Sequence, residues 1–228
     1  MMNHANQHGG HALVTGASSG IGVAIASRLL RDGWYVTGLD RTEPIINGPY
    51  FSPLMLDLSD ADAVRCALCT LKVNDLVHAA GILRFGELGS LDFAAGTDMW
   101  RVNVAAAMLL DDSGANASSR GPHRADRQPY CFRVRRPQPV CRHQVGAYRD
   151  GTFVGDGARA PAITVNVVSP TATETPMLLD PAAAASSRLP PIGRFVQPEE
   201  VAAATAFLLS EEAAAITGQM VMCGRSSL

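Results

Sequence analysis

Short apolar runs alternate with stretches of helical periodicity along much of the chain. In the first half, four apolar runs end in glycine or a charged residue and predict strands: residues 11–16, 34–40, 50–57 and 75–81. Apolar residues recur at helical spacing between them, at 21–33 and again at 59–71, where Ser59 is the expected N-cap. Strands that alternate with helices in this way indicate a parallel sheet covered on both faces.

The same alternation resumes near the end of the chain. Residues 162–170 form a nearly continuous β-branched run that ends in proline, 198–210 predict a helix that opens with Pro198 and two acids, and 218–224 predict a last strand. The sequence therefore predicts an α/β fold, a doubly wound parallel sheet of Rossmann type, in a single domain. We expect a flexible tail at 1–10 and this domain at 11–228.

The composition argues against charged macromolecular partners. The 228 residues are 47% apolar, with a net charge of −2 and a pI near 6.3, so neither nucleic acid nor an anionic membrane is an expected partner. We find no uncharged apolar run long enough to span a membrane, and the first ten residues lack the pattern of a secretory signal. We expect a cytoplasmic protein that binds a small molecule.

Five cysteines at irregular spacing suggest neither a disulfide framework nor a metal site. Cys66 and Cys69 fall within the helix predicted at 59–71. A redox or metal role would need an activating turn or a second ligand pair, so we interpret them as buried helix thiols.

The loop between the first strand and the first helix has the composition of a phosphate cradle. It has the sequence TGASSGIG, residues 15–22. Gly16 permits the tight turn, Gly20 lets backbone N–H groups approach a pyrophosphate, and Gly22 allows close packing of helix against strand. In this context of strand, loop and helix, the motif predicts nucleotide binding.

An acidic residue ends the second predicted strand. The carboxylate of Asp40 would accept hydrogen bonds from the adenosine ribose and repel a 2′-phosphate, which favours NAD. Arg41 follows and could pair with that phosphate, so NADP is the less favoured alternative.

These and further motifs resemble the classical short-chain dehydrogenase/reductase family. TGASSGIG matches its glycine motif, LDL with Asp57 its adenine-contacting segment, HAAG at 78–81 its strand-four motif, and RVNVAAAM carries its helix asparagine as Asn103. NVVSPTATETPM resembles its Pro-Gly motif followed by the nicotinamide-side threonine, and the stretch to residue 224 resembles its C-terminal signature. The cofactor contacts that the resemblance implies are Gly16, Ser18, Ser19, Gly20, Ile21, Gly22, Asp40, Arg41, Asp57, Leu58, Ala79, Ala80, Gly81, Pro170 and Thr175.

The resemblance also implies hydride transfer between a nicotinamide cofactor and a secondary alcohol, dihydrodiol or carbonyl. AAGILRFG at 79–86 is similar to 2,3-dihydro-2,3-dihydroxybenzoate dehydrogenases, which use NAD, although short matches of this kind recur among relatives. Members are often tetrameric, so a homo-tetramer or dimer is an expected assembly. Three positions depart from the family pattern: His78, Thr171 and Cys223 replace asparagine, glycine and aspartate.

The catalytic tyrosine of the family needs a lysine four residues later and a serine upstream. The lysine cation lowers the pKa of the phenol toward working pH. Here the 19 basic residues are 18 arginines and one lysine, Lys72, which precedes the fourth predicted strand and lies on the wrong element. Tyr148 is the best tyrosine candidate, yet Thr152 occupies the lysine position; Tyr130 is the competitor. The catalytic residues implied by the resemblance are therefore Tyr148 and Asn103.

The missing catalytic residues belong to a whole region of unusual composition. Residues 111–160 contain nine arginines but no leucine, isoleucine, methionine or lysine, and no serine occurs between Ser119 and Ser169. Such a composition argues against the buried central strand and long helix that the fold needs. Prolines and scattered glycines give the arginines no regular face for nucleic acid.

Three hypotheses account for residues 111–160. We favour a frame-shifted or misread stretch of a family gene, because the apolar periodicity stops abruptly and resumes at residue 161. A second hypothesis is a catalytically impaired variant that binds NAD as a regulatory module. A third is an irregular insert that uses another group, such as Asp111, Asp112 or His143.

Overall fold

The computed structural model describes residues 10–86, 89–110, 128–130, 163–179 and 189–224. The strands are β1 (His11–Thr15), β2 (Tyr35–Asp40), β3 (Phe51–Met55), β4 (Asp75–His78), β5 (Gln128–Tyr130), β6 (Ile163–Val165), β7 (Val167–Pro170) and β8 (Met220–Cys223). The helices are α1 (Gly20–Arg31), α2 (Ala61–Thr70), α3 (Phe93–Trp100), the π-helical η1 (Arg101–Ala105), α6 (Pro176–Leu179), α8 (Pro198–Leu209) and the 3-10 helix η3 (Glu211–Ala213).

The strands form a parallel sheet with the order of a doubly wound fold. Six strands follow the order β3-β2-β1-β4-β5-β6, and β7 pairs with β8 in a second parallel ladder. The sheet order reverses between β1 and β4, and crevices at such a reversal are where ligands bind in open α/β sheets. The predicted α/β architecture is confirmed.

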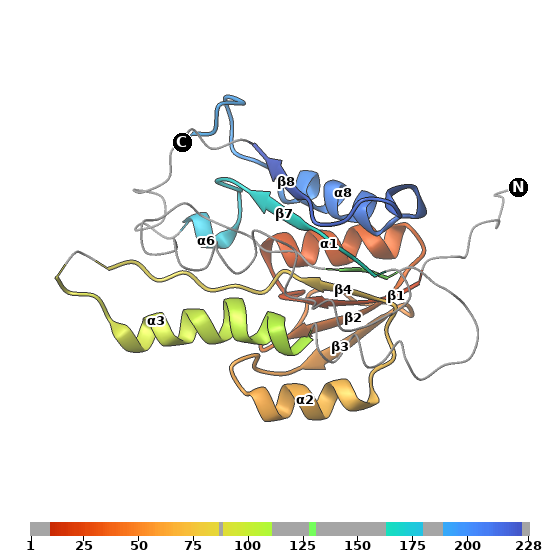
Figure 1. Cartoon of the computed structure of the whole chain (residues 1–228), viewed down its shortest axis with the longest axis horizontal. Coiled ribbons are helices and arrows are strands. Elements are labelled where there is room, and N and C mark those ends of the chain that lie inside the picture. The colour runs from red at the N-terminus through yellow and green to blue at the C-terminus, as the bar shows by residue number, and fades with distance from the viewer. Residues whose placement is uncertain (1–9, 87–88, 111–127, 131–162, 180–188, 225–228) are drawn as a thin grey trace, which may run out of the picture.

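Helices cover the sheet on both sides. Figure 1 shows α1 and α8 together on one side and α2 and α3 on the other. Two apolar clusters lie between these layers, one around Ile25 and Leu29 of α1 with Val201 of α8, and one around Leu39 and Val64. Each such side chain, fully buried, contributes roughly 1.5–3 kcal/mol to folding.

The N-cap of α2 differs from the sequence prediction. The Asp60 carboxylate accepts hydrogen bonds from the backbone N–H groups of Asp62 and Ala63, at 3.2 and 3.0 Å, so Asp60 and not Ser59 caps the helix. Ser59 instead donates its backbone N–H to Asp57. Both are good capping residues, and the preceding turn decides between them.

The two thiols of α2 are exposed, so the prediction that they are buried was wrong. Val64 is fully buried and Leu68, one turn later, packs against the same cluster, so this face of α2 is directed to the sheet. Cys66 and Cys69 lie outside this face and point to solvent.

The predicted strand at 162–170 is divided at Asn166. The Asn166 side chain is buried; its amide donates to the Ile216 carbonyl at 2.8 Å and its oxygen accepts from the Gln219 N–H at 3.1 Å. These bonds attach the break to the segment before β8, so β6 pairs with β5 and β7 pairs with β8.

Most of the arginine-rich segment, including Tyr148, lies outside the described residues. The exception is β5, whose backbone pairs with Leu76 of β4 and with β6. The expectation that residues 111–160 could not supply a central strand was therefore wrong for these three residues. Backbone pairing of so short a strand needs no apolar side chains of its own.

No helix within the described part of the chain is both long and apolar enough to cross a membrane. Among the same residues, no group of three or more histidine, cysteine or acidic side chains could hold a metal ion.

Candidate functional site

A cleft of about 300 Å³ opens at the carboxyl ends of the parallel strands. Its walls come from the loops that follow β1, β2, β3, β4 and β7, with one residue of η1. The lining residues are Gly16, Ser19, Gly20, Ile21, Gly22, Leu39, Asp40, Arg41, Thr42, Leu56, Asp57, Leu58, Ala79, Ala80, Gly81, Ile82, Val102, Thr171, Thr173, Thr175, Pro176 and Met177.

The loop between β1 and α1 needs glycines because other backbone atoms lie too close for a side chain. Gly16 has φ +70°, and a Cβ there would lie 2.8 Å from the backbone of Ala80. A Cβ on Gly22 would overlap the carbonyl of Gly16. Gly20 has φ +51° and faces the Thr175 methyl group. The loop therefore has the bare backbone that lets N–H groups at the start of α1 contact an anion.

The carboxylate of Asp40 is fixed at the cleft by three hydrogen bonds. One oxygen accepts from the Ser18 N–H at 3.0 Å, and the other accepts from the N–H and hydroxyl of Thr42, both at 3.1 Å. Ser18 also donates its hydroxyl to the Thr42 carbonyl at 2.8 Å. The glycine loop and the end of β2 are thus joined through one acidic side chain.

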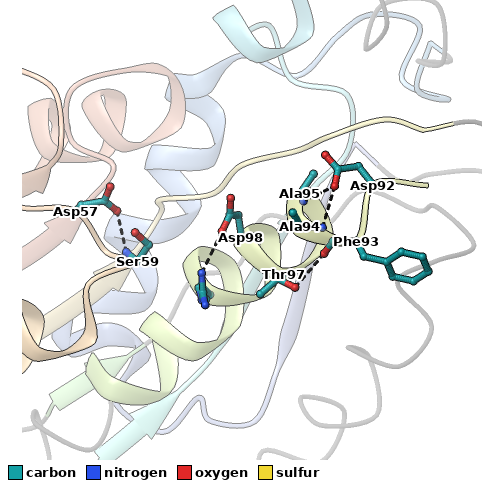
Figure 2. Close-up of polar contacts among 9 residues, drawn as sticks. Asp57, Ser59, Asp92, Phe93, Ala94, Ala95, Thr97 and Asp98 are labelled. Carbon is teal, nitrogen blue, oxygen red and sulfur yellow. Dashed lines mark hydrogen bonds and ion pairs between the residues drawn. The ribbon is translucent and has the colours of Figure 1, made fainter. Parts of the chain in front are cut away.

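A second acid lies beyond β3. Asp57 accepts the backbone N–H of Ser59 at 2.8 Å, as Figure 2 shows. The hydrogen bonds from Ser59, aided by the nearby charge of Arg41, lower the pKa of Asp57. Asp57 is therefore ionised near neutral pH, and it lines the cleft together with Arg41 and Leu58.

The strand-four motif is held by Thr15. The Thr15 hydroxyl accepts the Ala80 N–H at 3.1 Å and lies 2.9 Å from Nδ1 of His78. Thr15 and His78 are both buried. A histidine at this position is thus accommodated by a polar partner on β1, and the backbone at 79–81 still faces the cleft.

Asn103 lies on η1 and contacts the cleft only through its neighbours. Its amide donates to the Ile82 carbonyl and its oxygen accepts the Ile82 N–H, both at 2.9 Å. Both polar atoms of the side chain thus hold the chain after β4. The π-helical turn around Asn103 changes the backbone pairing, and such turns are frequent at functional sites.

The wall after β7 is attached to the last strand. Thr171 donates its N–H to the Cys223 carbonyl at 3.0 Å, and its hydroxyl lies 2.7 Å from the Gly224 carbonyl. Two of the departures from the family pattern, Thr171 and Cys223, are therefore in direct contact. Burial raises the pKa of the Cys223 thiol, assisted by the charge of Glu200.

Most of the cofactor residues expected from the sequence lie at this cleft. Ser18 and Pro170 do not line it, although Ser18 orients Asp40 and Pro170 ends β7. Tyr148 lies outside the described residues. Sequence reasoning missed Thr42, whose position two residues after a strand-ending aspartate is typical of a side-chain-capped turn. It also missed the apolar lining, for which the sequence carries no local signal: Leu39, Leu56, Ile82, Val102, Pro176 and Met177.

Two family models match the chain on either side of the arginine-rich segment. A model described as short chain dehydrogenase matches residues 10–118, and one described as enoyl-(acyl carrier protein) reductase matches 158–224. The chain belongs to the short-chain dehydrogenase/reductase family. It is an oxidoreductase, as the motifs indicated, and residues 119–157 fall outside both matches.

Curated members of the family align with nearly the whole chain. The short-chain dehydrogenase/reductase is 30% identical over 244 residues to D-erythrulose reductase of Gallus gallus, with 94% of each chain covered. It is 32% identical over 234 residues to 3-oxoacyl-(acyl-carrier-protein) reductase of Salmonella typhimurium, with 91% and 93% covered. It is 30% identical to 2,3-dihydro-2,3-dihydroxybenzoate dehydrogenase of Escherichia coli, with 96% and 98% covered.

Solved structures show the same fold. Ligand-free aldohexose dehydrogenase of Thermoplasma acidophilum has a TM-score of 0.79, at 24% identity and with 97% of both chains covered. A structure from Beutenbergia cavernae, described as a putative NAD(P)-dependent gluconate 5-dehydrogenase with NADP bound at low occupancy, has a TM-score of 0.74 at 25% identity, with 93% and 94% covered.

Proposed function

We propose that this short-chain dehydrogenase/reductase transfers a hydride between NAD(H) and a secondary alcohol, dihydrodiol or carbonyl. The observation that carries the proposal is the Asp40 carboxylate, held at the cleft by Ser18 and Thr42. A fixed carboxylate accepts ribose hydroxyls and repels a 2′-phosphate. NADP is the less favoured cofactor, since Arg41 alone offers a positive charge beside Asp40 among the described lining residues.

The residues that line the cleft support the binding of a dinucleotide. We assign the bare backbone of Gly16, Gly20 and Gly22 to the pyrophosphate, at the positive end of the α1 dipole. Asp57 and Leu58 would border the adenine, and Thr175 the nicotinamide. When bound, the nicotinamide accepts or donates the hydride, while the protein orients the two reactants and excludes water.

The genetic code supports the frame-shift hypothesis, because it limits what the residues of the arginine-rich segment become in another reading frame. If the bases are read one position forward, each new codon takes two bases from one residue and the third from the next. Gln144 followed by Val145 then specifies only lysine or arginine, and Val140 followed by Cys141 specifies tyrosine, phenylalanine, serine or cysteine. A Tyr-x-x-x-Lys pair is thereby permitted at the spacing that the family needs.

The same frame permits apolar residues at several positions. His143 and Tyr148 become isoleucine or threonine, and Asp150 and Asp156 become methionine or threonine. Leucine is available at Thr152 and is one of two possibilities at Phe153. The shifted frame therefore permits the residue types that the written segment lacks, in the region that both family models leave unmatched.

A peptide map joined to a turnover assay tests this proposal. Tandem mass spectrometry across 111–160 should show leucine-containing peptides with a tyrosine and a lysine four residues later, and the protein should oxidise secondary alcohols or cyclic dihydrodiols with NAD. Peptides that match the written residues, together with NAD binding but no turnover, would favour the second candidate, an NAD-binding regulatory module.

The relatives support a substrate class for the proposed reaction. Two relatives are named for a ketose and a cyclic dihydrodiol, which supports a small hydroxylated or carbonyl substrate.

We propose a homo-tetramer or dimer in the cytoplasm, without nucleic acid or membrane partners. Light scattering after size exclusion would contradict this assembly if it gave the mass of one 24.0 kDa chain.

A further inference from the structure

The segment after β7 forms one wall of the cleft and lies opposite the glycine loop. Thr171, Thr173 and Thr175 all line the cleft, and the Thr175 methyl group faces Gly20. The position of this wall therefore sets the width of the cleft at the end assigned to nicotinamide.

Backbone pairing joins this wall to the segment before α8. The Val196 N–H donates to the Ala172 carbonyl at 3.0 Å, and the Glu174 N–H donates to the Val196 carbonyl at 2.9 Å. These two bonds form a short parallel bridge at Thr173. The wall is thus attached to α8, which packs on α1 in the same apolar cluster.

Side chains extend the attachment on the surface. The Gln197 amide donates to the Glu174 carboxylate at 2.7 Å, and the Gln197 backbone N–H donates to Glu200 at 2.9 Å. Arg194 holds Glu200 with two bonds of 2.6 Å. The hydrogen bonds from Arg194, then that from Gln197, lower the pKa of Glu200 to about 2, so Glu200 stays charged through the neutral range.

We propose that Glu174 and Gln197 are a positioning pair that holds Thr175 against the glycine loop and thereby sets the affinity for the nicotinamide half of the cofactor. The inference rests on the proposed cofactor function. Glu174 is exposed, and exposed pairs add little to global stability. The pair is therefore expected to change the position of the wall more than the stability of the fold.

The experiment compares NADH with ADP-ribose, which lacks the nicotinamide and keeps the adenine half. We would titrate both into the full chain and into Glu174→Ala, Gln197→Ala, the double variant and the exchanged pair Glu174→Gln/Gln197→Glu. Gln197→Ala keeps the backbone N–H that Glu200 accepts. Glu199→Ala is the matched control, because it also removes one exposed glutamate charge but from the first turn of α8 and outside the pair.

Each single alanine variant is expected to weaken NADH about two- to tenfold, with no further loss in the double variant. The exchanged pair restores an amide-to-carboxylate bond and should bind NADH within about twofold of the wild type. ADP-ribose affinity and the control should be unchanged. The positioning-pair proposal is overturned if every variant binds NADH as tightly as the wild type, or if NADH and ADP-ribose lose affinity equally. Either result leaves the proposed cofactor function in place. Failure of the wild type to bind either ligand overturns the cofactor function itself.

Discussion

Single residues determine the chemistry of the cleft, and the sequence identifies some of them better than others. Gly16 and Gly22 were predictable because a backbone that must pass within contact distance of another tolerates no Cβ, and glycine alone meets that need. The contact of Asp40 with Thr42 was not predicted, since a threonine after an acid occurs in many turns. Tyr148, assigned by its local sequence, lies outside the described residues and stays a prediction.

Asp40 should control the choice of cofactor. In Asp40→Ser, loss of the carboxylate frees the Ser18 and Thr42 donors and removes a charge that repels the 2′-phosphate. The preference for NADH over NADPH should fall at least about tenfold, or ~1.4 kcal/mol, as measured by calorimetric titration. Glu43→Gln, which removes an exposed charge nearby, should leave the preference unchanged. An unaltered ratio in Asp40→Ser would show that the carboxylate does not discriminate.

Gly22 should be intolerant of a methyl group. A Cβ in Gly22→Ala overlaps the Gly16 carbonyl and displaces the phosphate loop. NADH binding should weaken by about tenfold or more, or ~1.4 kcal/mol. Gly96→Ala is the matched control, because no atom lies within 4 Å of a Cβ at that position of α3. Normal NADH affinity in Gly22→Ala would contradict the close packing at this loop.

At the scale of elements, the alternation of apolar runs placed β1 to β4, α1, α2 and α8 but did not place α3 or β5, and the ends of the elements depended on tertiary contacts. The run at 162–170 looks continuous in sequence, yet Asn166 bonds to Ile216 and Gln219 and divides it. Ser59 and Asp60 are both capping residues, and only the turn at Asp57 selects between them. Long-range partners of this kind have no local pattern.

The cap of α2 gives a prediction on stability. Asp60→Ala should lower the free energy of unfolding by about 1 kcal/mol, because two N–H groups at the helix start lose their acceptor. Ser59→Ala should change it by less than about 0.5 kcal/mol, since the Ser59 side chain caps no N–H group of the helix and the contact with Asp57 is exposed. Urea unfolding measures both, and a larger loss in Ser59→Ala would restore Ser59 as the cap.

At the scale of the whole molecule, function requires segments that are far apart in sequence to meet. The cleft combines loops from β1 to β7, and the Glu174–Gln197 bond joins one of its walls to the helix that packs on α1. The doubly wound order was predictable from the strand–helix alternation, because parallel neighbours need such crossovers. The side-chain bonds across it were not, since they depend on how the packed layers align.

Asp75, at the start of β4, gives a pH dependence of folding. Burial raises the pKa of Asp75 from 3.8 to about 8, so the folded state holds its proton. The stability that the neutral carboxyl provides is complete below pH 4, decreases as the pH rises, and is lost above pH 8, by at most about 1.4 kcal/mol per pH unit.

The Asp75→Asn variant keeps the shape of the side chain but replaces the titratable carboxyl group with a neutral amide. Urea unfolding should give similar free energies for wild type and variant near pH 4, and a variant more stable by about 1 kcal/mol or more at pH 8. Subtraction of the two profiles removes the contribution of His11, whose own pKa is lowered by burial. A constant difference from pH 4 to 8 would show that Asp75 is ionised in the fold.

The proposed function depends most on the preference of the cleft for NAD(H) over NADP(H). Calorimetric titration of the purified chain with NADH and NADPH, at one salt concentration, tests it most directly. We expect one site per chain, with NADH bound at least about tenfold, or ~1.4 kcal/mol, more tightly than NADPH. Tighter binding of NADPH, or no binding of either, would contradict the role assigned to Asp40 and the cleft around it.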